Sequence, residues 1–203
     1  MNSEQSMPDK PWQLAAHFVA NRIQRFKTSD NDSKVRATLA KLRKGVAESP
    51  ASSPELWEIT LADLPEALLS NANNGEPTKG EWAVHLALSL FALHQQGKDI
   101  KSQCMHQTTE KTQSHALGSA IRTLTLTHEE EAVRRRFNML ATSSGIEEFA
   151  HHLRSMVQLL KASNTPLDYK QLTQDLYLFQ IPDMRDNLRL RWGQDYYRFT
   201  KSE

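Results

Sequence analysis

The strongest constraint on the fold is residues 80–97, which read GEWAVHLALSLFALHQQG. At the 3.6-residue period of an α-helix, the apolar side chains of this stretch point in nearly every direction, whereas a surface helix is apolar on one side only. These side chains are Trp82, Val84, Leu86, Leu88, Leu90, Phe91 and Leu93. The stretch therefore predicts a helix at the centre of the core, surrounded by other helices.

Most of the remaining chain also has helical period, and no stretch alternates apolar and polar residues as a half-buried strand does. These patterns predict an all-α fold. Residues 97–113 have no apolar period and predict a loop or linker. We therefore expect two small helical bundles, a smaller N-terminal one in residues 1–96 and a larger C-terminal one of about five helices in residues 114–203.

Local signals predict where several helices begin. Ser33 is the expected N-cap of a basic helix, and Ser144 with Glu147 has the spacing of a capping box. Pro182 is expected in the first turn of the last helix. Gly118 lies inside a helical pattern at a cost of about 1 kcal/mol relative to alanine, which indicates that another backbone comes close to it.

Composition and motifs argue against several functions. The chain has 203 residues, of which 38% are hydrophobic and 24% charged, as in a globular protein. Its apolar runs are too short to cross a bilayer and its N-terminus lacks a signal-peptide pattern, so we expect a cytoplasmic protein. Cys104 is the single cysteine, so there is no internal disulfide. Zinc-binding, phosphate-loop and hydrolase motifs are missing, so we expect no metal site, no cofactor and no enzymatic activity.

Positive charge is concentrated in one part of a chain whose formal net charge is only +1. Residues 21–47 contain eight basic side chains and two acidic ones, whereas residues 55–82 contain six acidic side chains and one basic one. This asymmetry predicts two different faces, one suited to a polyanion and one that avoids it or meets a basic partner.

Residues 33–45, SKVRATLAKLRKG, predict an amphipathic basic helix. Its expected buried stripe consists of Val35, Leu39, Leu42 and Val46. The basic side chains lie outside this stripe, with Arg36 and Arg43 on one flank, Lys34 and Lys41 on the other, and Lys44 directed away from the core. Arg36, Lys41 and Arg43 have no acidic residue three or four positions away to neutralise them. A solvated helix face without a specific role stays open as the alternative.

Three consecutive arginines, Arg134, Arg135 and Arg136, form a second basic motif. Glu130 and Glu131 precede the first two by four residues, which is a favourable orientation for salt bridges within a helix. Arg136 has no such partner. An exposed guanidinium can contact phosphate even when it is loosely paired, so both a structural and a phosphate-binding role stay open for the three arginines.

An ordered series of motifs resembles one protein family. The motifs are KVRATLAKLRKG, WAVHLALSLFALHQQG, SHALGSAIRTL, RRRFNMLATS, FAHHLRSMVQLL, TPLDYKQLTQDLYLF and RLRWGQDYYR. Over roughly residues 31–198 the chain resembles the CasB family, the small subunit of the type I-E CRISPR interference complex Cascade. The resemblance implies an all-helical, non-enzymatic protein that pairs head to tail with a second copy. It also implies a position between the guide-RNA backbone subunits and the large subunit.

The resemblance further implies that basic surfaces hold the guide RNA assembly and stabilise target DNA, chiefly the displaced single strand. Carried over to this sequence, that role falls on Arg43, Lys44, Arg134, Arg135, Arg136, Arg185 and Arg189, with Arg36, Lys41, Arg122 and Arg154 as further candidates. Lys44 stands where the family pattern leads us to expect arginine, and Asn187 and Leu190 stand at positions that are often basic. The basic surface of the last helix is therefore expected to be smaller in this chain.

Two alternatives to this function stay open. One is a purely architectural adaptor, whose basic helix docks on acidic protein subunits. The other is a free helical DNA-binding regulator, which would need a helix-turn-helix with a recognition helix after a short turn. No segment of the sequence has that pattern clearly.

Overall fold

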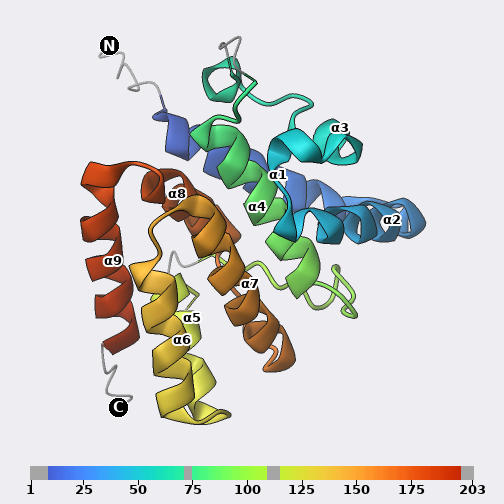
Figure 1. The fold of residues 1–203 in the computed structure, drawn as a ribbon. Coiled ribbons are helices and arrows are strands. Elements are labelled where there is room, and N and C mark those ends of the chain that lie inside the picture. Colours follow the sequence, from blue (N-terminus) through green and yellow to red (C-terminus); the bar gives the residue numbers. More distant parts are fainter. Residues whose placement is uncertain (1–8, 71–74, 109–114, 198–203) are drawn as a thin grey trace, which may run out of the picture.

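The computed structural model describes residues 9–70, 75–108 and 115–197, and Figure 1 shows their arrangement. In these ranges the chain forms α-helices and short 3-10 turns without a strand, and one isolated bridge joins His106 and Leu167. The predicted all-α class is confirmed. Residue 114, where the C-terminal bundle was expected to begin, lies outside the described residues.

The central helix is α4 (Lys79–His94), and twelve of its residues are buried. Figure 1 shows it in the middle of the molecule. The longer helices of the described chain are α1 (Pro11–Thr28), α2 (Asp32–Leu42), α6 (Glu130–Thr142), α7 (Ile146–Ala162), α8 (Tyr169–Phe179) and α9 (Pro182–Tyr197), and the short ones are α3 (Trp57–Thr60) and α5 (Leu117–Thr123). α1, α2, α7 and α8 all pack against α4. This arrangement confirms the prediction made from the apolar residues around the helix.

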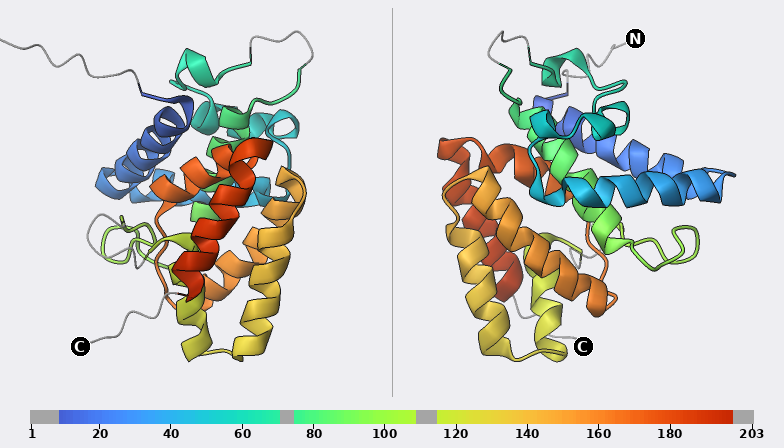
Figure 2. Two further views of the ribbon diagram at one scale, coloured as in Figure 1. Left: turned by 90° about the vertical axis from the view of Figure 1, so that its left-hand side faces the viewer. Right: turned by 45° about the vertical axis from the view of Figure 1, so that its right-hand side comes forward.

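The hydrophobic core is continuous on both sides of the expected linker. Buried side chains of α1, α4, α7, α8 and α9 belong to one cluster. α1 packs along α8, where the rings of Trp12 and Tyr177 lie 6.3 Å apart. The two views of Figure 2 show helices from the two ends of the chain side by side in the body of the molecule. The division into two bundles at residues 97–113 stays a prediction about folding units.

α5 and α9 approach each other closely at Gly118. A Cβ atom added there would lie 2.3 Å from the carbonyl oxygen of Trp192 and 2.8 Å from Cβ of Asp195. No side chain fits between the two backbones, so the predicted close approach is confirmed. Pro182 is the first residue of α9, as predicted.

Two predicted helix starts are wrong by one or two residues. Asn31 caps α2, because its Oδ1 accepts a hydrogen bond from the Lys34 backbone N–H at 2.9 Å. Asn31 is the first of three consecutive residues able to cap, so Ser33 lies inside the helix. α7 begins at Ile146, one residue later than expected, which places Glu148 at the third helical position. Glu148 therefore accepts hydrogen bonds from the backbone N–H and hydroxyl of Ser144, each 2.8 Å long.

Candidate nucleic-acid interface

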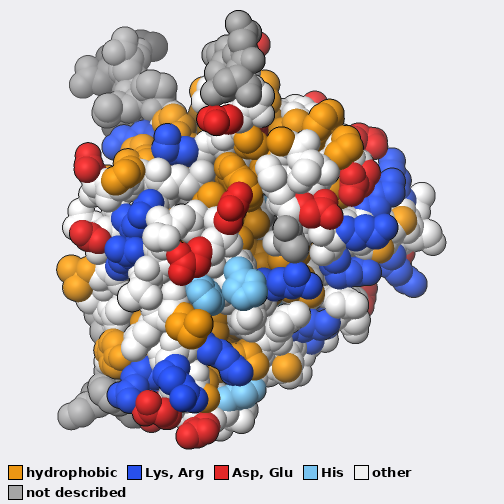
Figure 3. Space-filling model, in the orientation of Figure 1, with side chains coloured by type: hydrophobic (Ala, Val, Ile, Leu, Met, Phe, Trp, Pro, Cys, Tyr) orange, Lys and Arg blue, Asp and Glu red, His pale blue; other side chains and the backbone are white. Residues whose placement is uncertain are grey.

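α2 is anchored by the predicted apolar stripe and leaves its other sides open. Val35, Leu39, Leu42 and Val46 are all buried, which confirms the stripe. After Leu42 the chain tightens into a 3-10 turn, η1 (Arg43–Ala47), so Arg43 and Lys44 lie on this turn rather than in the α-helix. Figures 1 and 3 show α2 at one side of the molecule, under a group of blue basic side chains.

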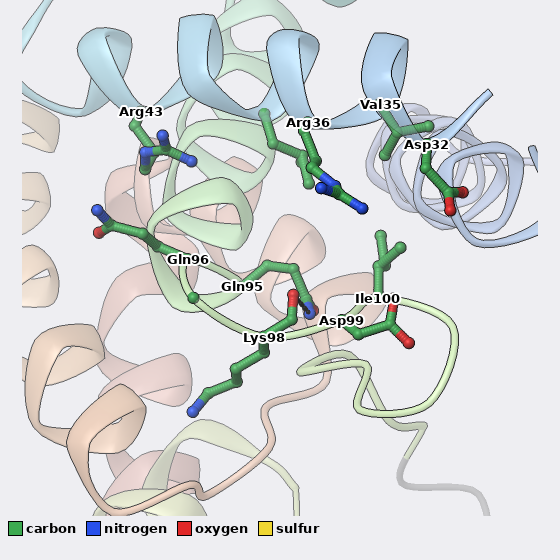
Figure 4. Close-up of a pocket in the computed structure, with 11 residues that line it drawn as sticks. Asp32, Val35, Arg36, Arg43, Gln95, Gln96, Lys98, Asp99 and Ile100 are labelled. Carbon is green, nitrogen blue, oxygen red and sulfur yellow. Dashed lines mark hydrogen bonds between the residues drawn. The ribbon is translucent and has the colours of Figure 1, made fainter.

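A groove of about 440 Å³, here called the arginine groove, runs between α2 and the segment that follows α4. Its lining consists of Asp32, Val35, Arg36, Leu39 and Arg43 from α2 and η1, and residues 95–100 from the opposite wall. Figure 4 shows the guanidinium groups of Arg36 and Arg43 on the side of α2 that faces this wall. The structure thus brings together the two arginines that helical geometry placed on one flank.

Both acidic side chains of the arginine groove already have other partners. The Asp32 carboxylate lies 2.8 Å from Lys101 Nζ. Asp99 accepts hydrogen bonds from the hydroxyl and backbone N–H of Ser102, at 2.6 and 3.1 Å, and these bonds lower the pKa of Asp99. The guanidinium groups of Arg36 and Arg43, by contrast, form no hydrogen bond or ion pair with any part of the chain that the structure describes.

Two lysines that sequence reasoning missed lie close to the arginine groove. Lys98 is part of its lining and donates a hydrogen bond to Asn164 Oδ1. Lys161, in the last turn of α7, donates to the side-chain oxygen of Gln96 at 2.8 Å. Lys161 could have been noticed from sequence, because it follows Arg154 by seven residues and so shares its helix face. Lys98 gave no such signal, since it lies in a stretch without helical period.

Arg154 lies on the wall of a separate groove of about 360 Å³ between η1, α4 and α7. Val46 and Glu48 line this groove from the η1 side, and His151 lines it from α7. Arg154 is exposed, and it shares the lining of this groove with Val46 of η1.

The opposite flank of α2 has its own shallow groove of about 300 Å³, which includes Lys34 and Lys41. Glu58 and Arg22 contribute to the same lining. Arg22 is already committed, since its guanidinium donates to the Ala62 carbonyl and lies 3.4 Å from the Asp63 carboxylate. Lys34 and Lys41 are exposed, as the helical geometry predicted.

The three consecutive arginines lie on α6, at a distance from α2. Arg122 on α5 forms an ion pair with Glu130 at 2.7 Å, and Arg134 forms one with Glu131 at 2.6 Å. The predicted pairs Glu130–Arg134 and Glu131–Arg135 are therefore wrong, because Arg122 of the neighbouring helix binds Glu130 and Arg134 binds Glu131. The hydrogen bond between Arg122 and Glu130 raises the pKa of Arg122.

Arg135 and Arg136 are exposed, and neither has an ion pair or side-chain hydrogen bond within the described ranges. In Figure 3 a second group of basic side chains, mixed with acidic ones, covers the lower end of the molecule, where α6 begins in Figure 1. The basic residues singled out from sequence thus belong to separate surfaces rather than to one.

The arginines of α9 contact the protein itself. Arg185 donates to the carbonyl oxygens of Phe179, at 3.0 Å, and Ser144, at 2.7 Å, and its guanidinium lies over the Phe179 ring. Arg189 donates to the Ser143 carbonyl oxygen at 2.7 Å and to Asp186 at 3.2 Å. Both side chains therefore tie α9 to the connection between α6 and α7.

The described residues include neither a cluster of metal-ligand side chains nor a helix of membrane-spanning character. In these ranges no three His, Cys, Asp or Glu side chains come together as metal ligands would. None of the described helices combines the length and the apolar character needed to span a membrane.

Comparison with known proteins identifies the family. The family model for CRISPR-associated protein Cse2 matches residues 38–197. The crystal structure of CasB from Thermobifida fusca has a TM-score of 0.72 and 29% sequence identity over 91% of this chain and 98% of that one. CasB from Thermus thermophilus shares the fold, with a TM-score of 0.62 and 21% identity over 90% of this chain and 97% of its own. No curated protein sequence matches the chain. Because the family model matches most of the chain, this protein belongs to the CRISPR-associated Cse2 family, the CasB family of the type I-E Cascade.

Proposed function

We propose that this protein is a non-catalytic subunit of a type I-E Cascade complex, an RNA-guided DNA surveillance complex in antiviral defence. In this role it pairs with a second copy, contacts the backbone and large subunits, and stabilises the guide RNA, the target DNA and the displaced strand. Membership of the Cse2 family supports the assignment to Cascade. The nucleic-acid role rests on the charges of α2.

The observation that carries the nucleic-acid role is the pair of uncommitted guanidinium groups in the arginine groove. Arg36 and Arg43 are seven residues apart, which corresponds to about 10 Å along a helix axis. The nearby carboxylates of Asp32 and Asp99 are occupied by Lys101 and Ser102. A guanidinium binds phosphate through two parallel hydrogen bonds, which makes a phosphodiester backbone a fitting occupant.

The lining of the arginine groove favours phosphate contacts over base recognition. Its apolar members are Val35, Leu39 and Ile100, and none of its lining residues is aromatic. Proteins that stack the bases of single strands use aromatic side chains for this purpose. A groove with cations and without such rings supports binding that is independent of sequence. This is what a displaced strand of variable sequence requires, because exchange of a duplex for a guide–target hybrid is nearly balanced in energy.

A salt titration with matched variants tests this function. We expect the isolated protein to bind a single-stranded oligothymidylate weakly, with log K falling by about 0.7 for each phosphate contact per log unit of salt. Arg36→Ala with Arg43→Ala should reduce this slope. Lys34→Ala with Lys41→Ala removes the same charge from the other flank of the same helix and should reduce it less. Equal effects of the two variants, or an affinity independent of salt, would contradict the assignment to the arginine groove.

The same role can be tested in the assembled complex. Arg43→Ala with Lys44→Ala should shorten the lifetime of the R-loop in a single-molecule assay, while circular dichroism shows unchanged helicity. Crosslinks from these positions to protein subunits, and none to nucleic acid, would instead favour the architectural adaptor.

A further inference from the structure

The turn that presents Arg43 and Lys44 is intrinsically weak. η1 (Arg43–Ala47) is a 3-10 helix, and such helices are short because their hydrogen bonds have poorer geometry than those of an α-helix. Two basic side chains on such a turn can be held in a fixed direction only if other parts of the protein fix the turn.

The backbone of this turn lies directly on α4 at Gly45. A Cβ atom at Gly45 would lie 2.5 Å from Leu56 Cδ1, 2.9 Å from Ser89 Oγ and 3.0 Å from His85 Cε1. Gly45 is buried, while its neighbour Lys44 is exposed. The glycine therefore lets the turn dock against the central helix with its basic side chains outward.

His85 forms the polar contact that fixes this docking. Its Nε2 lies 2.9 Å from the carbonyl oxygen of Gly45, and the ring is 1% exposed. A carbonyl oxygen can only accept, so Nε2 must carry the proton and the ring is neutral or doubly protonated. Burial lowers the pKa of His85, which favours the neutral ring. The other ring nitrogen, Nδ1, is buried and has no hydrogen-bond partner by distance and angle among the described residues.

We propose that His85 is a positioning residue for nucleic-acid binding, which holds the η1 turn on α4 so that Arg43 and Lys44 face a bound phosphate backbone. This inference rests on the proposed function, because it assumes that Arg43 and Lys44 contact phosphate. His85 itself is buried and touches no ligand. Its effect on binding is transmitted through the Gly45 backbone.

A double-mutant cycle on the full chain tests the proposal, with a dye-labelled oligothymidylate as the probe and the salt dependence of its affinity as the readout. The slope of log K against log salt is negative, and a lower slope here means one of smaller magnitude. Arg43→Ala with Lys44→Ala should lower its magnitude by up to about 1.4, the value for two phosphate contacts on a single strand. His85→Leu should lower the slope in the same direction. When His85→Leu is added to the Arg43→Ala and Lys44→Ala variant, the slope should decrease little further. The side chains that His85 positions are already absent from that variant.

Two more variants separate positioning from general loss of stability. His85→Gln should restore the wild-type slope, since the glutamine amide can donate from nearly the position of Nε2. Thr173→Val removes a buried hydroxyl that donates to the Tyr169 carbonyl at 2.6 Å on α8. It should lower the unfolding midpoint and leave the slope unchanged. If His85→Leu does not fold, Gly45→Ala displaces the same turn from its other side and should lower the slope.

The outcomes distinguish this proposal from the function on which it rests. If Arg43→Ala with Lys44→Ala leaves the slope unchanged, the phosphate contacts themselves are refuted, and the positioning role with them. If that variant lowers the slope but His85→Leu and Gly45→Ala do not, or their losses add fully to it, only the positioning role of His85 is overturned.

Discussion

The arginines of α2 and its following turn η1 differ from those of α9 in what their guanidinium groups contact. Arg36 and Arg43 face the arginine groove without a protein partner in the described chain. Arg185 and Arg189 donate to backbone carbonyl oxygens of the connection between α6 and α7. The family resemblance assigned both pairs to nucleic-acid binding. The difference shows that the acceptors placed nearby by the fold decide how many donors of an arginine stay available to a ligand.

The comparison can be tested most severely at Arg191, a third arginine of α9. It pairs with Asp175, whose other carboxylate oxygen accepts a hydrogen bond from Trp192 Nε1 at 2.7 Å. Because Asp175 is buried, Arg191→Met should lower the free energy of unfolding by about 3 kcal/mol. Urea unfolding measures this change, with Arg135→Met as the control at an exposed arginine. Equal effects of the two variants would mean that the α9 arginines do not hold the fold.

A smaller loss is expected for Arg185→Ala with Arg189→Ala. These substitutions leave the carbonyl oxygens of Ser143 and Ser144 without their charged donors, and should cost about 2 kcal/mol of stability. The salt dependence of single-strand affinity should stay unchanged. If affinity fell as much as with Arg36→Ala and Arg43→Ala, α9 would belong to the binding surface, and the contrast between the two helices would be lost.

Acidification should weaken the fold without discharging the arginines of α2. Burial, with a contribution from Lys98, lowers the pKa of His94 from its ordinary 6.5 to about 4. The unfolded chain therefore binds a proton at higher pH than the folded one, so stability falls as pH drops below 6.5. From about pH 8 to about pH 6 the loss from His94 should be about 1 kcal/mol.

Urea unfolding at the two pH values measures this loss, and His94→Gln should reduce it. The affinity for a single strand should not decrease over the same range, because arginine stays protonated. If affinity fell together with stability, the binding surface would depend on the packing around α4. The separation between arginines that bind a ligand and residues that hold the fold would then be wrong.

The smallest expected effect is that of Arg36→Ala with Arg43→Ala on stability. Surface substitutions away from specific contacts usually change the free energy of unfolding by less than about 0.5 kcal/mol. Urea unfolding of this variant beside the wild type checks the value. A loss near that of the α9 variants would mean that these arginines have a structural role that the described contacts do not include.

The parts of the fold that follow from helical period were predictable, as the buried stripe of α2 and the central position of α4 show. The close approach of α9 to Gly118 was also predictable, because glycine destabilises a helix interior and is expected there only where a larger side chain does not fit. The helix starts were less certain, because Asn31, Asp32 and Ser33 can all cap and the surrounding structure decides among them.

The candidate site was predictable only as far as one helix determines it. The spacing of Arg36 and Arg43 placed them on one flank, but the opposite wall of the groove comes from a segment without period. The spacing of Glu130 and Arg134 indicated a pair within α6, and Arg122 of α5 takes that glutamate instead. The backbone acceptors of Arg185 and Arg189 leave no mark in the sequence, because every residue has a carbonyl oxygen.

The ion pair between Asp32 and Lys101 makes the two ends of the arginine groove different in charge. At one end, the start of α2, the Asp32 carboxylate lies 2.8 Å from Lys101 Nζ, so a negative and a positive charge are paired there. At the other end Arg43 is uncompensated, and Lys98 and Gln96 continue the lining toward Lys161 of α7. Figure 4 shows Asp32 toward one end of the groove and Arg43 toward the other. Under the proposed function, a polyanion in the groove would therefore be held most strongly at the base of α2, and its path would lead inward across the body of the protein rather than off the helix tip.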